Sequence, residues 1–223
     1  MNNPWTNISW NNTVADCDKH IISPAYSAEK GIDISNLPEP YTGNINSNVV
    51  CLNLNPGIGK CDACFRFDSH FLSLTQETLC HRTDHLMWLD NDIKCKLGGL
   101  HEGCEWWQSR TKELRKELGE IPLNMFIIEF FPYHTQNAFD FPPLPSDDYR
   151  NELLSKALHD KKLIIIMRGK NRWESIIGLG SELKKYDNII ELNNPRNVSF
   201  SQHNVGEGDN WNTLVAELKK TIK

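Results

Sequence analysis

The chain has 223 residues, of which 39% are hydrophobic and 24% charged, with a formal net charge of -5 at pH 7. This size suits one large globular domain, which buries a core without disulfides or metal. The acidic balance argues against a protein that coats nucleic acid non-specifically, although it allows a few local phosphate contacts. No apolar run approaches the roughly 20 residues of a membrane span, and the first residues lack the basic and apolar regions of a secretory signal. We therefore expect a monomeric cytoplasmic protein that does not bind membranes.

The seven cysteines are odd in number and irregularly spaced, which indicates reduced thiols rather than a disulfide framework. Cys61 and Cys64 form one closely spaced pair, whereas a structural zinc site usually needs two such pairs. We expect no cofactor and no metal, and the sequence leaves open whether Cys61 and Cys64 bind one.

Residues 1–47 are polar and rich in Asn, Ser and Pro, with sparse apolar side chains. This segment is predicted to be an arm of the same domain that wraps residues 48–223, with short helical pieces at most. The prolines of 37–43 exclude regular helix and central strand from that stretch.

Four apolar runs in the rest of the chain have the length of strands, at 49–54, 125–131, 163–167 and 189–192. Because they are continuous rather than alternating, we expect strands that are buried on both faces. Amphipathic or capped segments separate or follow them, which predicts helices at 106–118, 147–159, 173–179 and 211–222. Gly119 stands where a glycine that ends a helix belongs.

This alternation predicts a three-layer α/β/α sandwich around a central, mostly parallel four-stranded sheet. Ligands of such sheets bind beyond the carboxyl ends of the strands. The rule selects four loops, at 55–71, 132–146, 168–172 and 193–208.

Two of these loops carry related motifs. The first reads Asn53-Leu54-Asn55-Pro56-Gly57, and the last reads Asn193-Asn194-Pro195-Arg196-Asn197. Together they resemble the two active-site motifs of the uracil-DNA glycosylase superfamily, closest in pattern to its mismatch-specific and single-strand-selective branches. The lead-in of residues 37–43, the Trp106-Trp107 pair and the motif Phe-Pro-Tyr-His at 131–134 also resemble a set of bacterial proteins of unassigned function. The resemblance extends over about residues 37 to 220.

The resemblance implies a DNA-repair hydrolase, a DNA N-glycosylase that removes a deaminated or modified base. The alternative is a non-catalytic module that binds or senses a nucleotide or nucleic acid on the same fold. An unrelated function on a shared fold is a third reading, since fold does not fix function. DNA or a nucleotide is the expected partner in the first two.

In the first motif, the resemblance assigns Asn55 to positioning the hydrolytic water, which an amide oxygen can do as an acceptor. Pro56 and Gly57 would let the backbone pass close to the base or sugar. Asn53 stands where the family has glycine. The alternative is a β-turn in which these residues only reverse the chain.

A stacking aromatic is expected about a dozen residues after Asn55, where Phe67 falls; the alternative is a core side chain. In the second motif, Asn194 takes the catalytic position, although related families have histidine there. Pro195 would help press on the phosphate, Arg196 would pair with it, and Asn197 would hydrogen-bond the sugar or backbone. An Asn-Pro turn without function is the alternative.

Glu129 occupies the position from which the single-strand-selective branch reads uracil with an asparagine. Ionised Glu129 only accepts hydrogen bonds, which suits an exocyclic amine, whereas a protonated carboxyl regains a donor. The alternative is that Glu129 pairs with a local Arg or Lys and supports the fold. Tyr133 and His134 are expected at the entrance of the same strand-end site, with His134 as an electrophile or acid. Arg168 follows the third strand and is a candidate for phosphate contact.

Overall fold

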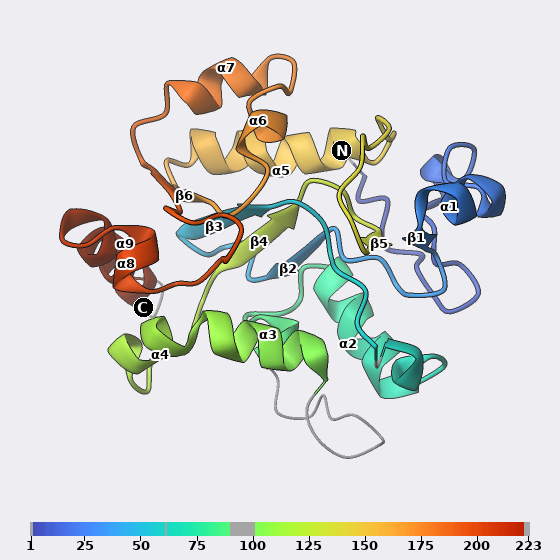
Figure 1. The fold of residues 1–223 in the computed structure, drawn as a ribbon, viewed down its shortest axis with the longest axis horizontal. Coiled ribbons are helices and arrows are strands. Elements are labelled where there is room, and N and C mark those ends of the chain that lie inside the picture. Colours follow the sequence, from blue (N-terminus) through green and yellow to red (C-terminus); the bar gives the residue numbers. More distant parts are fainter. Residues whose placement is uncertain (1, 61, 90–100, 221–223) are drawn as a thin grey trace.

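The computed structural model describes residues 2–60, 62–89 and 101–220. Its central sheet has five strands in the order β2-β4-β3-β6-β7 (Figure 1). Their bounds are Tyr41–Gly43 for β2, Val49–Asn53 for β3, Phe126–Glu129 for β4, Leu163–Ile166 for β6 and Ile189–Glu191 for β7. The four strands predicted from sequence are all present, and they run parallel to one another.

The prediction of four strands was wrong by one, because β2 lies within the proline-rich stretch. This strand pairs antiparallel with β4 alone, at the edge of the sheet. An edge strand tolerates nearby proline because one of its sides has no ladder partner to lose. Since β2 belongs to the main sheet, residue 47 is not a structural boundary between an arm and a domain.

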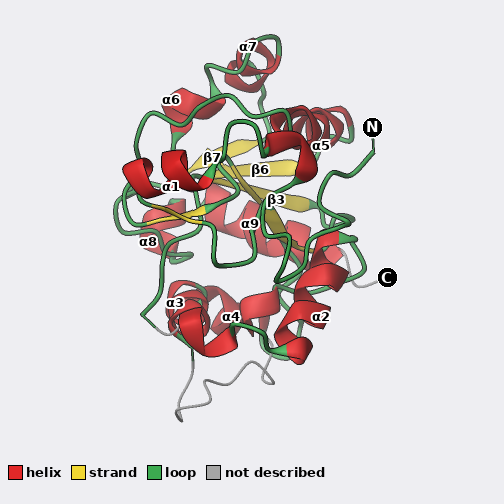
Figure 2. Cartoon of the chain, turned by 90° about the vertical axis from the view of Figure 1, so that its right-hand side faces the viewer, coloured by secondary structure: helices red, strands yellow, loops and turns green. Residues whose placement is uncertain are grey.

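Helices cover both faces of the sheet (Figures 1 and 2). One face carries α5 (Asp147–His159), α6 (Lys170–Trp173) and α7 (Leu179–Lys184). The other carries α2 (Ser69–Leu79), α3 (Glu102–Arg110), α4 (Lys112–Leu118) and α9 (Asp209–Lys220). The short α8 (Gln202–Val205) precedes α9. The described residues also form the 3-10 turns η1 (Asp16–Asp18), η2 (Asp62–Phe65) and η3 (Met87–Leu89). None of the described helices combines the length and the apolar character needed to cross a membrane.

The helix predictions differ from the structure at several places. The expected helix 106–118 is divided at Thr111, where the hydroxyl donates to the carbonyl of Trp107 at 2.6 Å. The expected helix 173–179 is absent, because α6 ends at Trp173 and Gly178, with φ of 84°, starts the separate α7. Helix α2 was not predicted.

The N-terminal segment does wrap the domain. Helix α1 (Pro24–Lys30) leads into β1 (Ile32–Asp33), which pairs antiparallel with β5 (His134–Thr135). Asp18 is fully buried and accepts hydrogen bonds from the Tyr133 hydroxyl at 2.8 Å and the Ser146 hydroxyl at 2.7 Å. These contacts fix the segment against the loop that follows β4.

The connections out of β3 and β4 turn to opposite faces of the sheet. The chain leaves β3 through α2, α3 and α4, and it leaves β4 through α5. The crevice between two such neighbouring strands is where open α/β sheets bind ligands. Asn53 and Glu129, the last residues of β3 and β4, are register partners at this point.

Candidate functional site

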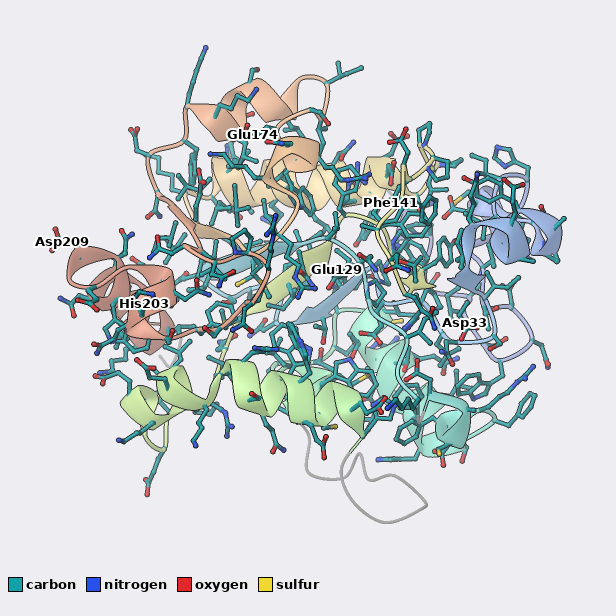
Figure 3. The ribbon with its side chains drawn as sticks, viewed as in Figure 1. Asp33, Glu129, Phe141, Glu174, His203 and Asp209 are labelled. Atoms are coloured by element: carbon teal, nitrogen blue, oxygen red, sulfur yellow. The ribbon has the colours of Figure 1, made fainter. Side chains whose placement is uncertain are left out.

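A pocket of about 260 Å³ opens at the carboxyl ends of β3, β4 and β6. It is lined by Glu39, Asn53, Asn55, Pro56, Gly57, Ile58, Gly59, Asp62, Trp88, His101, Glu102, Gly103, Trp106, Trp107, Glu129, His134 and Arg168. Figure 3 shows Glu129 near the centre of the molecule, at the end of β4. The pocket therefore contains seven of the thirteen predicted site residues, which are Asn53, Asn55, Pro56, Gly57, Glu129, His134 and Arg168.

The Asn53 and Glu129 side chains form a buried pair between neighbouring strands. The amide nitrogen of Asn53 donates to Oε1 of Glu129 at 2.8 Å. The remaining oxygens, Oδ1 of Asn53 and Oε2 of Glu129, are buried and have no hydrogen-bond partner among the described residues. Because buried polar atoms in proteins are nearly always paired, the two unpaired oxygens of these pocket residues are candidates to bind a polar ligand.

The protonation state of Glu129 decides whether its Oε2 donates or accepts a hydrogen bond. Burial raises the pKa of Glu129 to about 8; the hydrogen bond from Asn53 opposes the rise, the nearby Glu39 carboxylate adds to it, and the Arg168 charge opposes it. At neutral pH the carboxyl is therefore protonated, with Oε2 as a donor beside the acceptor Oδ1 of Asn53. Above pH 8 both open atoms become acceptors.

Glu39 lines the pocket but was not predicted from sequence. Its flanking prolines indicate only that the chain there is neither helix nor central strand. Its Oε2 accepts from the indole N–H of Trp88 at 2.9 Å, and its Oε1 lies 3.4 Å from Nε2 of His134. Burial raises the pKa of Glu39, and the neighbouring His134 opposes that rise. Glu39 therefore places a second carboxyl close to Glu129.

His134 lines the pocket but both its ring nitrogens face carbonyl oxygens. Nδ1 lies 2.6 Å from the carbonyl of Gly57, and Nε2 lies 3.0 Å from that of Leu37. Oε1 of Glu39 also lies 3.4 Å from Nε2, so three acceptor oxygens surround the ring. His134 thus connects the first-motif loop to the N-terminal segment, and a role as an acid would require one of these bonds to break.

The side chain of Asn55 is held in one orientation. Its amide nitrogen donates to the Thr135 hydroxyl at 2.8 Å and to the carbonyl of Pro56 at 3.0 Å. The Thr135 hydroxyl itself donates to the carbonyl of Asn137 at 3.1 Å, so it must accept from Asn55. This network leaves Oδ1 of Asn55 without a bond to the described residues, as the prediction of a water-positioning amide requires.

Three tryptophans contribute aromatic surface, which the sequence analysis did not assign to the site. Trp106 and Trp107 meet edge to face, with centroids 4.9 Å apart and planes at 85°, and Trp88 stacks on His101 at 4.8 Å. The sequence predicts Trp106 and Trp107 at the start of a helix. In the structure, Trp107 is buried, whereas Trp106 is half-buried and lines the pocket.

Phe67 and Tyr133 do not line the pocket, contrary to their predicted roles. Phe67 is 67% exposed and contacts Trp10 and Arg66 at the surface, with φ of 66°. Phe65 turns inward in its place and stacks on Phe71 at 4.7 Å. Tyr133 is 1% exposed because its hydroxyl is committed to Asp18.

The second-motif loop also lies outside the pocket lining. Oδ1 of Asn194 accepts from the backbone N–H groups of Arg196 at 3.2 Å and Asn197 at 3.1 Å, which makes a local turn. Pro195 and Arg196 are exposed, and Asn197 accepts from Arg110. The pocket therefore contains Asn55 and Glu129 but neither Asn194 nor Phe67. The hydrogen bonds of Asn194 form a local Asn-Pro turn, which is the structural alternative that the sequence analysis left open for this loop.

Within residues 2–60, 62–89 and 101–220, no three His, Cys, Asp or Glu side chains converge as a metal site would require. The question of Cys61 and Cys64 lies partly outside this range, because Cys61 is not among the described residues.

Comparison with known proteins found no matching family model, no similar curated protein and no similar solved structure. The fold and the site define an α/β protein whose mostly parallel sheet carries a polar and aromatic pocket at its strand ends.

Proposed function

We propose that this protein is a hydrolytic DNA N-glycosylase of the uracil-DNA glycosylase superfamily, and that its pocket holds one deaminated base. The observation that carries the proposal is the Asn53–Glu129 pair, with its open donor and acceptor. The motif resemblance supplies the chemistry, and the pocket supplies a base-sized site beside Asn55.

A neutral Glu129 beside Asn53 is complementary to a ring carbonyl next to a ring N–H. The carbonyl accepts from Oε2 of Glu129, and the N–H donates to Oδ1 of Asn53. Uracil, hypoxanthine and xanthine carry this edge, and so do thymine and guanine. In the orientation that binds uracil, cytosine and adenine present an amine beside an unprotonated nitrogen, which reverses the pattern. The pair would therefore favour a base with a ring carbonyl beside a ring N–H, a group that includes the deaminated bases.

The dimensions of the pocket suit this ligand. A volume of about 260 Å³ is just below the range typical of drug-sized ligands, so it fits one heterocycle better than a longer ligand. Trp106 offers a half-buried aromatic surface at the pocket. Stacking of a base on such a surface contributes about 1–3 kcal/mol.

The hydrolysis would use Asn55 and Glu129 in different roles. A base enters such a pocket only when its nucleotide is turned out of the strand or is already unpaired. The open Oδ1 of Asn55 accepts a hydrogen bond from the attacking water and directs its oxygen at the anomeric carbon of the sugar. The C–O bond forms as the C–N bond breaks, the base leaves with the bonding electron pair, and the proton that the water loses ends on the released base. As the glycosidic bond breaks, the base gains negative charge, which the Oε2 proton of Glu129 stabilises on the ring carbonyl.

A non-catalytic base-binding module is the second candidate. The observation in its favour is the second-motif loop, whose asparagine is engaged in its own turn and which has no histidine at the catalytic position. This candidate shares the pocket and the base edge, and it lacks only the hydrolytic step.

The test is cleavage of single-stranded and duplex oligonucleotides that each carry one uracil, hypoxanthine, xanthine, cytosine or adenine at a fixed position. We expect abasic sites from the first three and none from the last two. Asn55→Ala, purified in parallel, controls for contaminating host glycosylases and should leave all substrates intact. Binding without cleavage would replace the glycosylase by the binding module. Neither binding nor cleavage of any oxo base would overturn both.

A further inference from the structure

Two arginines from different elements gather around Trp106 beside the pocket. Arg110 lies near the end of α3, with its guanidinium carbon 5.6 Å from the centre of the Trp106 ring. Arg168 follows β6, and its guanidinium carbon lies 5.9 Å from the same ring. We call these three residues the arginine cluster.

The positive charge of the cluster has little compensation. Among the described residues, neither arginine forms an ion pair, and the side chain of Arg168 forms no hydrogen bond. Arg110 donates from Nη1 to Oδ1 of Asn197 at 2.5 Å, and its Nε is buried without a partner. Burial lowers the pKa of Arg168, the Glu129 carboxyl opposes this, and the proximity of Arg110 lowers it further.

Two guanidinium groups held together in an otherwise acidic protein are unfavourable unless an anion lies between or beside them. Guanidinium groups match phosphate oxygens particularly well, because their planar donors bind two oxygens at once. Arg168 lines the base pocket, so an anion bound there would be attached to the ligand whose base enters it.

We infer that Arg110 and Arg168 bind a phosphate of the nucleotide whose base occupies the pocket. This inference rests on the proposed base site and adds the ligand class: a nucleotide, free or within a strand, rather than a free base or nucleoside. The same cluster explains how an acidic protein holds a polyanion, because the attraction is local.

The experiment compares the dissociation constants of 2′-deoxyuridine and 2′-deoxyuridine 5′-monophosphate by isothermal titration calorimetry at low salt. We expect the monophosphate to bind at least ten times more tightly. Arg110→Gln and Arg168→Gln should each bring this ratio toward one, and Arg110→Gln, which lies outside the pocket lining, should leave deoxyuridine affinity within about twofold. Arg168→Gln also removes a charge that favours ionised Glu129, so the neutral carboxyl stays available to the base.

Arg82→Gln is the matched control, because Arg82 is exposed and does not line the pocket. Its ratio should equal that of the unaltered protein. A short single-stranded oligonucleotide with one deoxyuridine forms a third arm: tighter binding than the monophosphate assigns the site to a strand, and weaker binding assigns it to a free nucleotide.

Equal affinity of the unaltered protein for nucleoside and monophosphate would overturn the phosphate site while leaving the base pocket intact. A tenfold ratio that survives in both arginine variants would overturn the assignment to these residues. If neither ligand binds, the base pocket itself is rejected, and the phosphate site falls with it.

Discussion

In the loop after β3, Asn55 donates from its amide nitrogen to Thr135 and leaves its oxygen open at the pocket. In the loop after β7, Asn194 directs its oxygen into its own turn and accepts two backbone N–H groups. Both loops contain Asn-Pro after a parallel strand, and both resemble motifs of one superfamily. The two asparagines differ in the groups around them. Strand β5 brings the buried Thr135 hydroxyl to Asn55, whereas the side-chain oxygen of Asn194 bonds only within its own turn.

Of these two strand-end asparagines, the one that lines the pocket is the one whose amide nitrogen is anchored by another element. Thr135 belongs to β5, which pairs with β1 of the N-terminal segment. The orientation of Asn55 therefore depends on the pairing of β1 with β5. In this pair Ile32 lies opposite Thr135, which is about 100 residues further along the chain.

The largest expected difference between the loops is catalytic. Asn55→Ala removes the only side chain proposed to hold the water, and we expect single-turnover cleavage of a uracil oligonucleotide to fall by about 100-fold or more, the scale of a lost positioning or electrostatic group. Asn194→Ala should change the rate by less than about threefold. Comparable losses in the two variants would show that the second loop reaches the reaction after all.

The next effect is the pH dependence of cleavage, which should follow the protonation of Glu129 in the pocket. Because the pKa of Glu129 is raised to about 8, its carboxyl is neutral below that pH and loses its donor above it. Uracil cleavage should therefore fall about tenfold for each pH unit above 8, as the neutral fraction falls.

Glu129→Gln has an amide donor that does not titrate, so its cleavage rate should stay level from pH 7 to pH 10. The folded protein also keeps a proton that the unfolded chain releases near pH 4.5. Its free energy of unfolding should accordingly decrease from pH 4.5 to pH 8 relative to that of Glu129→Gln. Parallel pH profiles for the two proteins would reject Glu129 as the titrating donor.

A smaller effect separates the two aromatic candidates. Trp106→Ala removes the half-buried ring at the pocket and should weaken binding of deoxyuridine by about tenfold, at the lower end of base stacking energies. Phe67→Ala should leave that affinity unchanged, because Phe67 is 67% exposed and outside the pocket lining. Titration of both variants by calorimetry measures this, and a loss confined to Phe67→Ala would restore the role predicted from sequence.

The smallest effect is the stability of the second loop. Asn194→Ala should lower the free energy of unfolding by about 0.5–1.5 kcal/mol, since it removes the acceptor of two backbone N–H groups. Asn194→Asp keeps an acceptor oxygen and should retain most of that stability in urea denaturation. If alanine has no effect and aspartate none, the turn does not depend on this side chain.

The sequence predicted the parts of the fold that follow from local pattern. Continuous apolar runs located β3, β4, β6 and β7, and the predicted helix 147–159 coincides with α5. Strand β2 was missed because three residues within a proline-rich stretch become a strand only through pairing with β4. The break between α3 and α4 falls at Thr111, whose local hydrogen bond periodicity does not register.

The site divides in the same way. The rule that parallel strands bind ligands at their carboxyl ends placed Asn53, Glu129 and Arg168 together, because each ends or follows a neighbouring strand. Glu39 and Trp88 could not be placed, since their approach to the pocket depends on how the N-terminal segment and η3 pack. Phe67 was misplaced because the turn after η2 brings Phe65 inward instead.

The strand order has a consequence for synthesis. During translation β2 and β3 emerge before β4, yet β4 lies between them in the finished sheet. The sheet in this order is therefore complete only after residues 126–129 have been synthesised. Glu129 ends this central strand, so the pocket wall that it forms with Asn53 is completed at the same stage as the sheet.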